Sequence, residues 1–542
     1  MFKNYQRIKF SLLPGTLISL TLLTFAFVLF YTLYTSQENL VFTQIEPRVW
    51  LLLKFTVYQA FLSTLFSLVV GILLAWSLAH QAKFRGRSWL VALFSSSLVL
   101  PTLIVVFGLI TVLGRNGWVN QVSLYLFDYS FGAYLYGLGG ILVAHVYLNA
   151  SFASRSLLHS FESIPKEKYK LAKSLNFTTF QRFMYVEWPV LKPTLLSIAS
   201  TIFLLCFTSF AIVLVLGGSP AYNTLEVAIY EAVKLDFDIA MALKLALIQL
   251  GLTTLLVVFS ANFRTHISNL KTATQAIAWE EKREVKYLQR GIISLFTLFF
   301  ILPLFAIIVD GIGADFSKIL QEKLFIKSFL TSMGLATLSS IITLLFAILL
   351  SDAKRNLTLR YRLADLPFSK LFNIVLSFSG NLYLAIPSLI MGLGFFLLSQ
   401  RYEAPLVFWS TVALLTANVL MSLPFALSVL APAMQRTAQR YDRLVFSLNL
   451  TKIQRWVYVE YPYLKSSLGY VFALAFCFSL GDLGMIALFG SDDFSTLPWY
   501  LYQLMGSYRS SDASGVALIL LVITLSAFIF LPKLFGGNHV KD

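Results

Sequence analysis

Two copies of one nineteen-residue stretch decide how this chain is organised. The first copy, SLNFTTFQRFMYVEWPVLK, covers residues 174–192, and the second copy, SLNLTKIQRWVYVEYPYLK, covers residues 447–465. Twelve of the nineteen positions are identical, at a constant offset of 273 residues. Weaker matches flank these copies, among them LPTL at 100–103 with IPSL at 386–389. Repetition over this much of the sequence indicates that each half of the chain is a copy of one unit.

The composition is that of an integral membrane protein. Hydrophobic residues make up 58% of the 542 residues, charged residues only 13%, and the mean hydropathy is +0.76. A soluble domain averages about 25% charged residues. The net charge of +16 lies mostly in loops between apolar runs, which fits membrane topology better than nucleic-acid binding. Both cysteines, Cys206 and Cys477, fall in apolar runs and are expected to be small buried hydrophobes.

Apolar runs long enough to cross a bilayer occur twelve times. They lie near residues 14–34, 50–79, 89–113, 132–152, 193–216, 239–261, 291–309, 326–350, 372–399, 406–429, 466–489 and 515–532. With the N-terminus inside, the inner segments carry 32 of the 42 lysines and arginines, as the positive-inside bias requires. The apolar run after Lys9 is long for a signal peptide and no small-residue cleavage site follows it, so we expect a retained first span.

The predicted fold class is therefore all-α, a polytopic membrane protein with twelve transmembrane helices in two parallel six-helix repeats. The first unit is expected at 1–270, a cytoplasmic linker at 271–290 and the second unit at 291–542. Six helices is an even number, so both units have the same orientation in the membrane. Both termini are expected in the cytoplasm.

The repeated loop predicts two short helices with a sharp corner between them. Asn176 and Asn449 stand where the first helix would stop, and asparagine tolerates the left-handed cap conformation. Thr178 with Gln181 then has the spacing of a capping box that starts a second helix, and the other copy has the same pair. The segment is either an amphipathic helix on lipid headgroups or one of two matched docking elements for a two-fold partner.

These loops resemble the EAA loop of ATP-binding-cassette importer permeases, which ends in a similar apolar-proline step. The resemblance implies coupling helices near 166–176 and 441–449, each seated in a groove of a cytoplasmic ATPase. It implies a coupling set of Lys170, Leu171, Ala172, Leu175, Asn176, Glu187, Arg443, Leu444, Val445, Leu448, Asn449 and Glu460. Lys170 and Arg443 stand at the family's acidic position, which removes the salt bridge expected there.

The same resemblance implies partners and a location. The partners are two cytoplasmic ATP-binding-cassette ATPase subunits and an extracytoplasmic solute-binding protein, with membrane lipid around the chain and no nucleic acid. The location is the bacterial cytoplasmic (inner) membrane. The apolar face that would enter the ATPase groove comprises Leu171, Ala172 and Leu175 in the first copy and Leu444, Val445 and Leu448 in the second.

A closer likeness covers nearly the whole chain. The fused double unit, SLGDLG at 479–484 and LFGSDDFSTLP at 488–498 are similar to the permeases of thiamine importers. This resemblance implies import of thiamine and its phosphates. Fused permeases for ferric iron or another small solute share the architecture and remain the alternative. A rival from another class is an ion-coupled twelve-helix secondary transporter, which gives no reason for two repeated inner loops.

The sequence contains no recognisable nucleotide-binding, catalytic or metal-binding motif. The chain has no Gly-x4-Gly-Lys-Ser/Thr phosphate loop, so ATP hydrolysis is assigned to a separate chain and this one is not expected to be an enzyme. The five histidines are scattered and none pair at ligand spacing, so no catalytic residues, metal site or cofactor is expected.

Polar residues inside predicted spans are the remaining candidates, because burying them in lipid is costly. Asp482 lies in the eleventh span between Gly481 and Gly484, and is either a pathway residue or a buried partner for neighbouring groups. Ser209 and Ser479 are assigned with it to the translocation pathway. Asn418 is expected to hydrogen-bond between helices, and Lys244 to extend toward a helix end.

Overall fold

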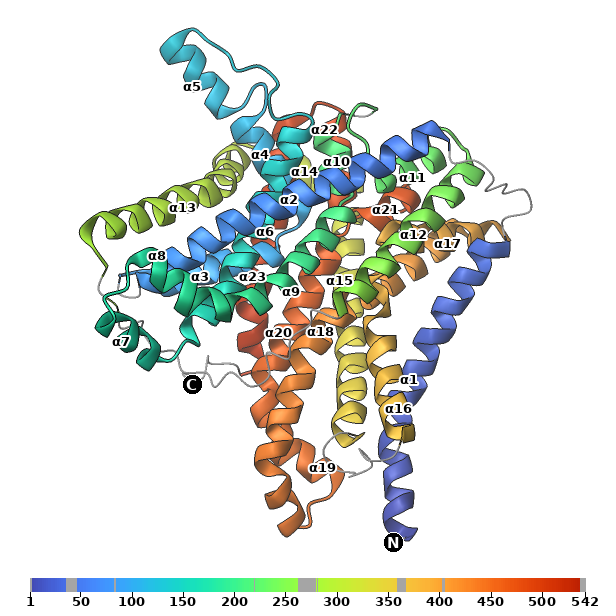
Figure 1. Cartoon of the computed structure of the whole chain (residues 1–542). Helices are drawn as coiled ribbons and strands as arrows, with labels where there is room; N and C mark the ends of the chain where they lie inside the picture. The colour runs from blue at the N-terminus through green and yellow to red at the C-terminus, as the bar shows by residue number, and fades with distance from the viewer. Residues whose placement is uncertain are drawn as a thin grey trace.

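The computed structural model describes residues 2–35, 46–81, 84–218, 220–261, 279, 281–357, 367–401 and 405–536. Every regular element within these ranges is a helix, as the composition predicted. In Figure 1 the helices α15, α18 and α20 run toward the bottom of the view, where α19 and the start of α1 lie, whereas α2 and α13 run across it toward the left, where α7 lies. Helices α5 and α22 lie at the top.

The two halves contain largely the same succession of helices, with twelve in the described residues of the first half and eleven in those of the second. The first half holds α1 (Phe2–Thr35), α2 (Pro47–His80), α3 (Arg87–Ser95), α4 (Thr102–Leu113), α5 (Trp118–Phe127), α6 (Leu138–Glu162), α7 (Lys166–Ser174), α8 (Thr179–Arg182), α9 (Trp188–Phe207), α10 (Ala211–Leu216), α11 (Leu225–Lys234) and α12 (Ile239–Ala261). The second holds α13 (Arg283–Ile312), α14 (Phe316–Gln321), α15 (Lys323–Arg355), α16 (Pro367–Asn381), α17 (Ser388–Arg401), α18 (Leu406–Ser447), α19 (Lys452–Arg455), α20 (Tyr461–Gly481), α21 (Gly484–Phe489), α22 (Leu497–Gly506) and α23 (Ser510–Leu534). Helices α2, α6, α9 and α12 thus correspond to α15, α18, α20 and α23.

Eleven of the twelve predicted spans coincide with helices apolar and long enough to cross a bilayer. Ten of these are single helices or short successions of them, and the eleventh is the bent pair α16 and α17. The twelfth predicted span, 132–152, corresponds to α6, which at 25 residues is about 37 Å long. Helix α6 carries buried polar side chains such as His145 and Asn149, which lower its hydropathy.

Both predicted spans at 89–113 and 372–399 are broken rather than continuous. Pro101 separates α3 from α4, and Pro387 separates α16 from α17, where the chain bends by 89°. A proline lacks an amide hydrogen and disfavours helix at the residue before it, so each break follows from the repeated Leu-Pro or Ile-Pro step. Much of the predicted linker 271–290 lies outside the described residues, and Arg283 already begins α13.

The predicted spans at 193–216 and 466–489 are also broken, and a further short helix follows each of them. Each long helix stops, a six-residue helix follows (α10 or α21), and a ten-residue helix comes next (α11 or α22). Most residues of α11 and α22 are buried. A sequence scan for membrane-length runs misses such helices because they are too short to span.

The first helix of each half packs against the other half. Helix α13 lies against α2 and α4, whereas α1 lies against α15, α16 and α17 (Figure 1). Tyr147 on α6 donates a hydrogen bond to the Phe300 carbonyl of α13 (2.6 Å), and Tyr383 donates to the Leu22 carbonyl of α1 (2.6 Å). Gly108 permits the close approach of α4 to α13, since a Cβ there would lie 2.8 Å from the Pro303 carbonyl oxygen. The two halves are therefore interlocked.

Candidate coupling loops and membrane cavity

The first repeated loop has the local geometry that its sequence predicts. Helix α7 ends before Asn176, whose φ of 51° places it in the left-handed region. The Phe177 amide donates to the Ala172 carbonyl (3.0 Å) and closes the turn. Thr178 and Gln181 form the reciprocal capping box that begins α8, which runs through a π-helical turn at Phe183–Glu187 into α9.

The second loop has the same corner but a different approach to it. Asn449 has a φ of 47°, Thr451 and Gln454 form the capping box of α19, and a π-helical turn at Trp456–Glu460 leads into α20. The predicted separate helix at 441–449 is wrong, because these residues up to Ser447 form the last turns of the 42-residue helix α18. In the first copy Pro165 interrupts the chain between α6 and α7, whereas Ala438 occupies the equivalent position in α18.

The predicted apolar face of each loop divides into an exposed and a buried part. The exposed leucines are Leu171, Leu175, Leu444 and Leu448, each between 49% and 61% exposed. Ala172 and Val445 are 1% and 7% exposed and pack inward, so they do not belong to a surface that a partner could contact. The flanking Lys170, Asn176, Arg443 and Asn449 are exposed.

Glu187 anchors the first loop in a buried group of charges, here called the first ion cluster (His80, Arg182, Glu187 and Glu281). Arg182 Nε lies 2.9 Å from Glu187 Oε1, and Arg182 Nη1 lies 2.6 Å from Glu281 Oε1. His80, at the end of α2, places Nε2 3.1 Å from the Glu187 carboxylate. The Arg182 side chain is fully buried, and its guanidinium also lies over the ring of Trp279, 4.9 Å from the centroid.

Glu460 anchors the second loop in an equivalent group, the second ion cluster (Asp352, Arg355, Arg455 and Glu460). Arg355 Nη1 lies 2.8 Å and Arg455 Nε 2.5 Å from Glu460 Oε1. Asp352 pairs with both arginines. Arg355 comes from the end of α15, just as His80 comes from the end of α2. Glu187 and Glu460, which the sequence grouped with the coupling surface, are thus buried residues that hold each loop against a long helix.

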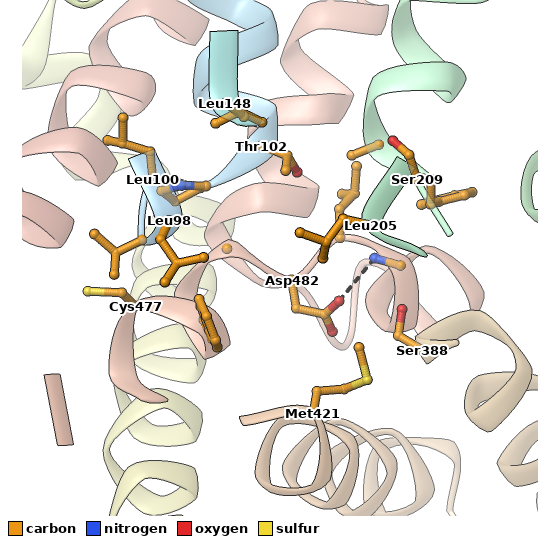
Figure 2. Close-up of a pocket in the computed structure, with 18 of the residues that line it drawn as sticks. Leu98, Leu100, Thr102, Leu148, Leu205, Ser209, Ser388, Met421, Cys477 and Asp482 are labelled. Atoms are coloured by element: carbon orange, nitrogen blue, oxygen red, sulfur yellow. Dashed lines mark hydrogen bonds between the residues drawn. The ribbon is translucent and has the colours of Figure 1, made fainter. Parts of the chain in front are cut away.

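A cavity of about 320 Å³ lies where helix breaks from both halves meet. Its walls include the Pro101 break, the α9–α10 break at Ser209, the start of α17 at Ser388 and the α20–α21 break at Asp482. Figure 2 shows the Asp482 carboxylate with Leu98, Leu205, Ser388 and Met421 around it. Ser209 and Asp482 are 273 residues apart, so the repeat places a hydroxyl in one half and a carboxylate in the other.

The predicted pathway residues divide between cavity and helix interface. Asp482 and Ser209 line the cavity, whereas Ser479 does not. Ser479 instead accepts a hydrogen bond from Asn418 Nδ2 (2.7 Å), which joins α18 to α20 as predicted for Asn418. Lys244 is 8% exposed, and its Nζ lies 3.3 Å from Glu46, which immediately precedes α2.

Two polar residues near the cavity were not predicted. His145, on α6, lines the cavity and is 2% exposed, with Nδ1 2.9 Å from the Ser63 hydroxyl. Glu226, on α11, is 1% exposed, accepts a hydrogen bond from Gln249 Nε2 (2.9 Å) and lies close enough to Asp482 for their charges to repel. An acid inside the apolar LEVAIY segment at 225–230 was a usable signal, but the segment lies between the predicted spans at 193–216 and 239–261.

Comparison with known proteins supplies the family. A family model described as "binding-protein-dependent transport system inner membrane component" matches residues 67–269. The thiamine transport system permease protein ThiP of Escherichia coli K12 is 36% identical over 537 residues, covering 98% of both chains. The Haemophilus influenzae protein of the same name is 35% identical over 93% of both chains, and the Brucella abortus 2308 protein is 36% identical over 90% of this chain and 88% of its own.

The matched region includes the first repeated loop and all the residues of the first half that line the cavity. Likeness at this level along nearly the whole length extends the relationship to both halves and to both loops. The chain accordingly belongs to the binding-protein-dependent inner membrane permeases of ATP-binding-cassette importers, in the group that contains these fused thiamine-system proteins.

Proposed function

We propose that this permease imports thiamine and its phosphates. The observation that supports this is the 36% identity, over 98% of the chain, to the thiamine transport system permease protein of Escherichia coli K12. Asp482 is the one carboxylate among the described residues that line the cavity, which is compatible with a cationic cargo. Ferric iron or another small solute is the alternative, because related fused permeases share the architecture.

The test is uptake of labelled thiamine by cells that have no other thiamine route. Deleting this chain should abolish uptake, and restoring it should rescue uptake. Unchanged uptake in the deletion strain contradicts the proposal. Labelled ferric complexes in the same strains provide the comparison, and loss of iron uptake alone favours the alternative.

We further propose that the chain forms the complete membrane channel of its importer, with two ATPase subunits and one extracytoplasmic binding protein. A single chain carries two repeated loops, one after α6 and one at the end of α18. Both belong to the inner segments that hold most of the lysines and arginines, so the positive-inside bias puts them, and both termini, on the cytoplasmic side. Native mass spectrometry of the assembled complex should show one copy of this chain with two ATPase subunits, and two copies of this chain contradict the proposal.

The exposed leucines of the two loops are the proposed contacts with the ATPases. Leu171, Leu175, Leu444 and Leu448 project from corners held by a capping box on one side and a buried ion cluster on the other. Closure of an ATPase dimer needs a rigid insert on each subunit if motion is to reach the membrane helices. Lys170 and Arg443 flank these leucines and meet the rim of the groove or the lipid. The alternative, that both segments only lie on lipid, is tested below.

A further inference from the structure

The cavity at the meeting point of the helix breaks has the size and position of a ligand site. Its volume of about 320 Å³ is within the range for small-molecule pockets, which begins near 300 Å³. Both halves contribute walls to the cavity. The first half contributes the helix breaks at Pro101 and Ser209, and the second half contributes those at Ser388 and Asp482. A ligand there would contact residues of both halves at once.

The charge of the cavity is uneven in a way that selects a ligand. Asp482 is the one acidic side chain among the described lining residues, and no lysine or arginine is among them. Its Oδ1 accepts a hydrogen bond from the Gly484 amide (3.2 Å), and the Met485 amide is a second donor near the carboxylate. Its buried Oδ2 has no hydrogen-bond partner among the described residues (Figure 2). A carboxylate removed from water is costly unless a cation or further donors compensate it.

A second polar side chain in the same cavity, His145, has one ring nitrogen without a partner. His145 is 2% exposed; its Nδ1 pairs with the Ser63 hydroxyl, and its Nε2 has no hydrogen-bond partner among the described residues. Asn149 lies one helical turn further along α6 and also lines the cavity. The wall from α6 therefore offers hydrogen-bonding capacity that the protein itself leaves unused.

The remaining walls are apolar and partly aromatic. Phe152, Phe210, Phe425 and Phe478 line the cavity. Aromatic faces stabilise organic cations through cation–π attraction but provide no ligands for a metal ion. Hard metal cations take six or more oxygen ligands, and transition metals need several donors. Among the described residues, no three His, Cys, Asp or Glu side chains come together, so the composition of this cavity favours an organic cation over a metal ion.

We propose that this cavity binds one organic cation inside the membrane domain, with Asp482 as its counter-ion and His145 as a hydrogen-bonding partner. The proposal deepens the proposed function, because it assigns the cationic ring of thiamine to the carboxylate contributed by the second half alone. It gives the permease a substrate preference of its own, in addition to that of a binding protein.

The test is direct binding to the purified full chain in lipid nanodiscs. The probes are labelled thiamine and an isostere in which a neutral thiophene replaces the thiazolium ring. Wild-type protein should bind thiamine at least about tenfold more tightly than the isostere, and Asp482→Asn should weaken thiamine binding by about tenfold or more while leaving the isostere little changed. Asp482→Glu, which keeps the charge, should recover part of the affinity.

Controls separate binding from folding. Asp310→Asn makes the same chemical change on α13, away from the cavity, and should bind thiamine like wild type. Melting curves for all variants show whether the fold is retained. Equal thiamine affinity in wild type and Asp482→Asn, equal affinity of wild type for both probes, or binding of neither thiamine nor choline each overturns the site.

Failure of the site and failure of the proposed function give different results. If uptake depends on this chain but binding does not depend on Asp482, the thiamine function stands and the site falls. If uptake is independent of this chain while Asp482-dependent binding of a quaternary ammonium probe such as choline is found, the site stands and the thiamine function falls.

Discussion

The two coupling loops share one sequence motif but are supported in different ways. In the first half a proline separates α6 from the short helix α7, and in the second half α18 runs without interruption into the corner. The first ion cluster takes Glu281 from beyond the last helix of its half, whereas the second takes Asp352 from α15 itself. The motif thus sets the shape of the corner, and the surroundings set how firmly it is held.

Removing the arginine of the repeated motif from each ion cluster should give the largest difference in stability between the two loops. Arg182→Ala leaves two buried carboxylates with His80 alone and should destabilise the protein by about 3–5 kcal/mol. Arg455→Ala leaves Glu460 paired with Arg355, so we expect about 1–2 kcal/mol. Thermal and chemical unfolding of the two purified variants measures the difference. Equal losses at the two sites would mean that the clusters are equivalent supports.

Charging the exposed leucines should abolish docking of the ATPases. Burying one leucine contributes roughly 1.5–3 kcal/mol, and Leu175→Asp or Leu448→Asp also requires desolvation of a carboxylate. Each variant should lose ATPase co-purification while its melting curve stays unchanged, because both side chains lie at the surface. Leu320→Asp, an equally exposed leucine on α14 at the other end, is the control. Full ATPase recovery with both variants identifies the segments as lipid-surface helices.

Exchanging the residues that distinguish the two approaches should have unequal effects. Ala438→Pro removes a backbone hydrogen bond and introduces a clash inside α18, at a cost of about 3 kcal/mol. Pro165→Ala releases a break that already exists, so stability should change by less than about 1 kcal/mol. Circular dichroism and unfolding curves report both changes, and a large loss with Pro165→Ala would show that the break itself stabilises the first half.

The smallest effect is expected at the corners, where the halves agree. Asn176→Gly and Asn449→Gly should each stabilise the corner by a few tenths of a kcal/mol, because glycine adopts positive φ without steric cost. Both substitutions should act alike, since the capping box beyond each asparagine is the same. A clear difference between them would extend the asymmetry of the loops to the motif itself.

The sequence predicted what is decided locally. The left-handed asparagines and the capping boxes depend on neighbours within five residues, so their pattern alone was sufficient. Pro165 and its missing counterpart were also readable, but the continuous end of α18 was not inferred from them. The ion clusters join residues about 100 apart in sequence, and no local pattern pairs His80 with Glu187 or Arg355 with Glu460. The cavity likewise exists only once distant breaks are brought together.

Membrane residues were predicted with mixed success for a similar reason. Asp482 was visible as an acid within an apolar span, and it does line the cavity. Ser479 lies inside α20 and is paired with Asn418 of α18, whereas Asp482 follows the end of α20, where the backbone becomes extended. The sequence did not show where α20 ends, so it did not separate these two residues. Glu226 was hidden in a helix too short to register as a membrane element.

The packing of the first helix of each half against the other half has a consequence for synthesis of the protein. Helices α2 and α4 leave the ribosome before α13 exists, and the Phe300 carbonyl that receives the Tyr147 hydroxyl lies 153 residues beyond that tyrosine. During synthesis the first half must therefore remain in lipid with one flank open, and only the arrival of α13 closes it. Joining both halves in one polypeptide keeps the missing helix at high effective concentration, so the fused chain shortens the time in which that flank is available to wrong partners.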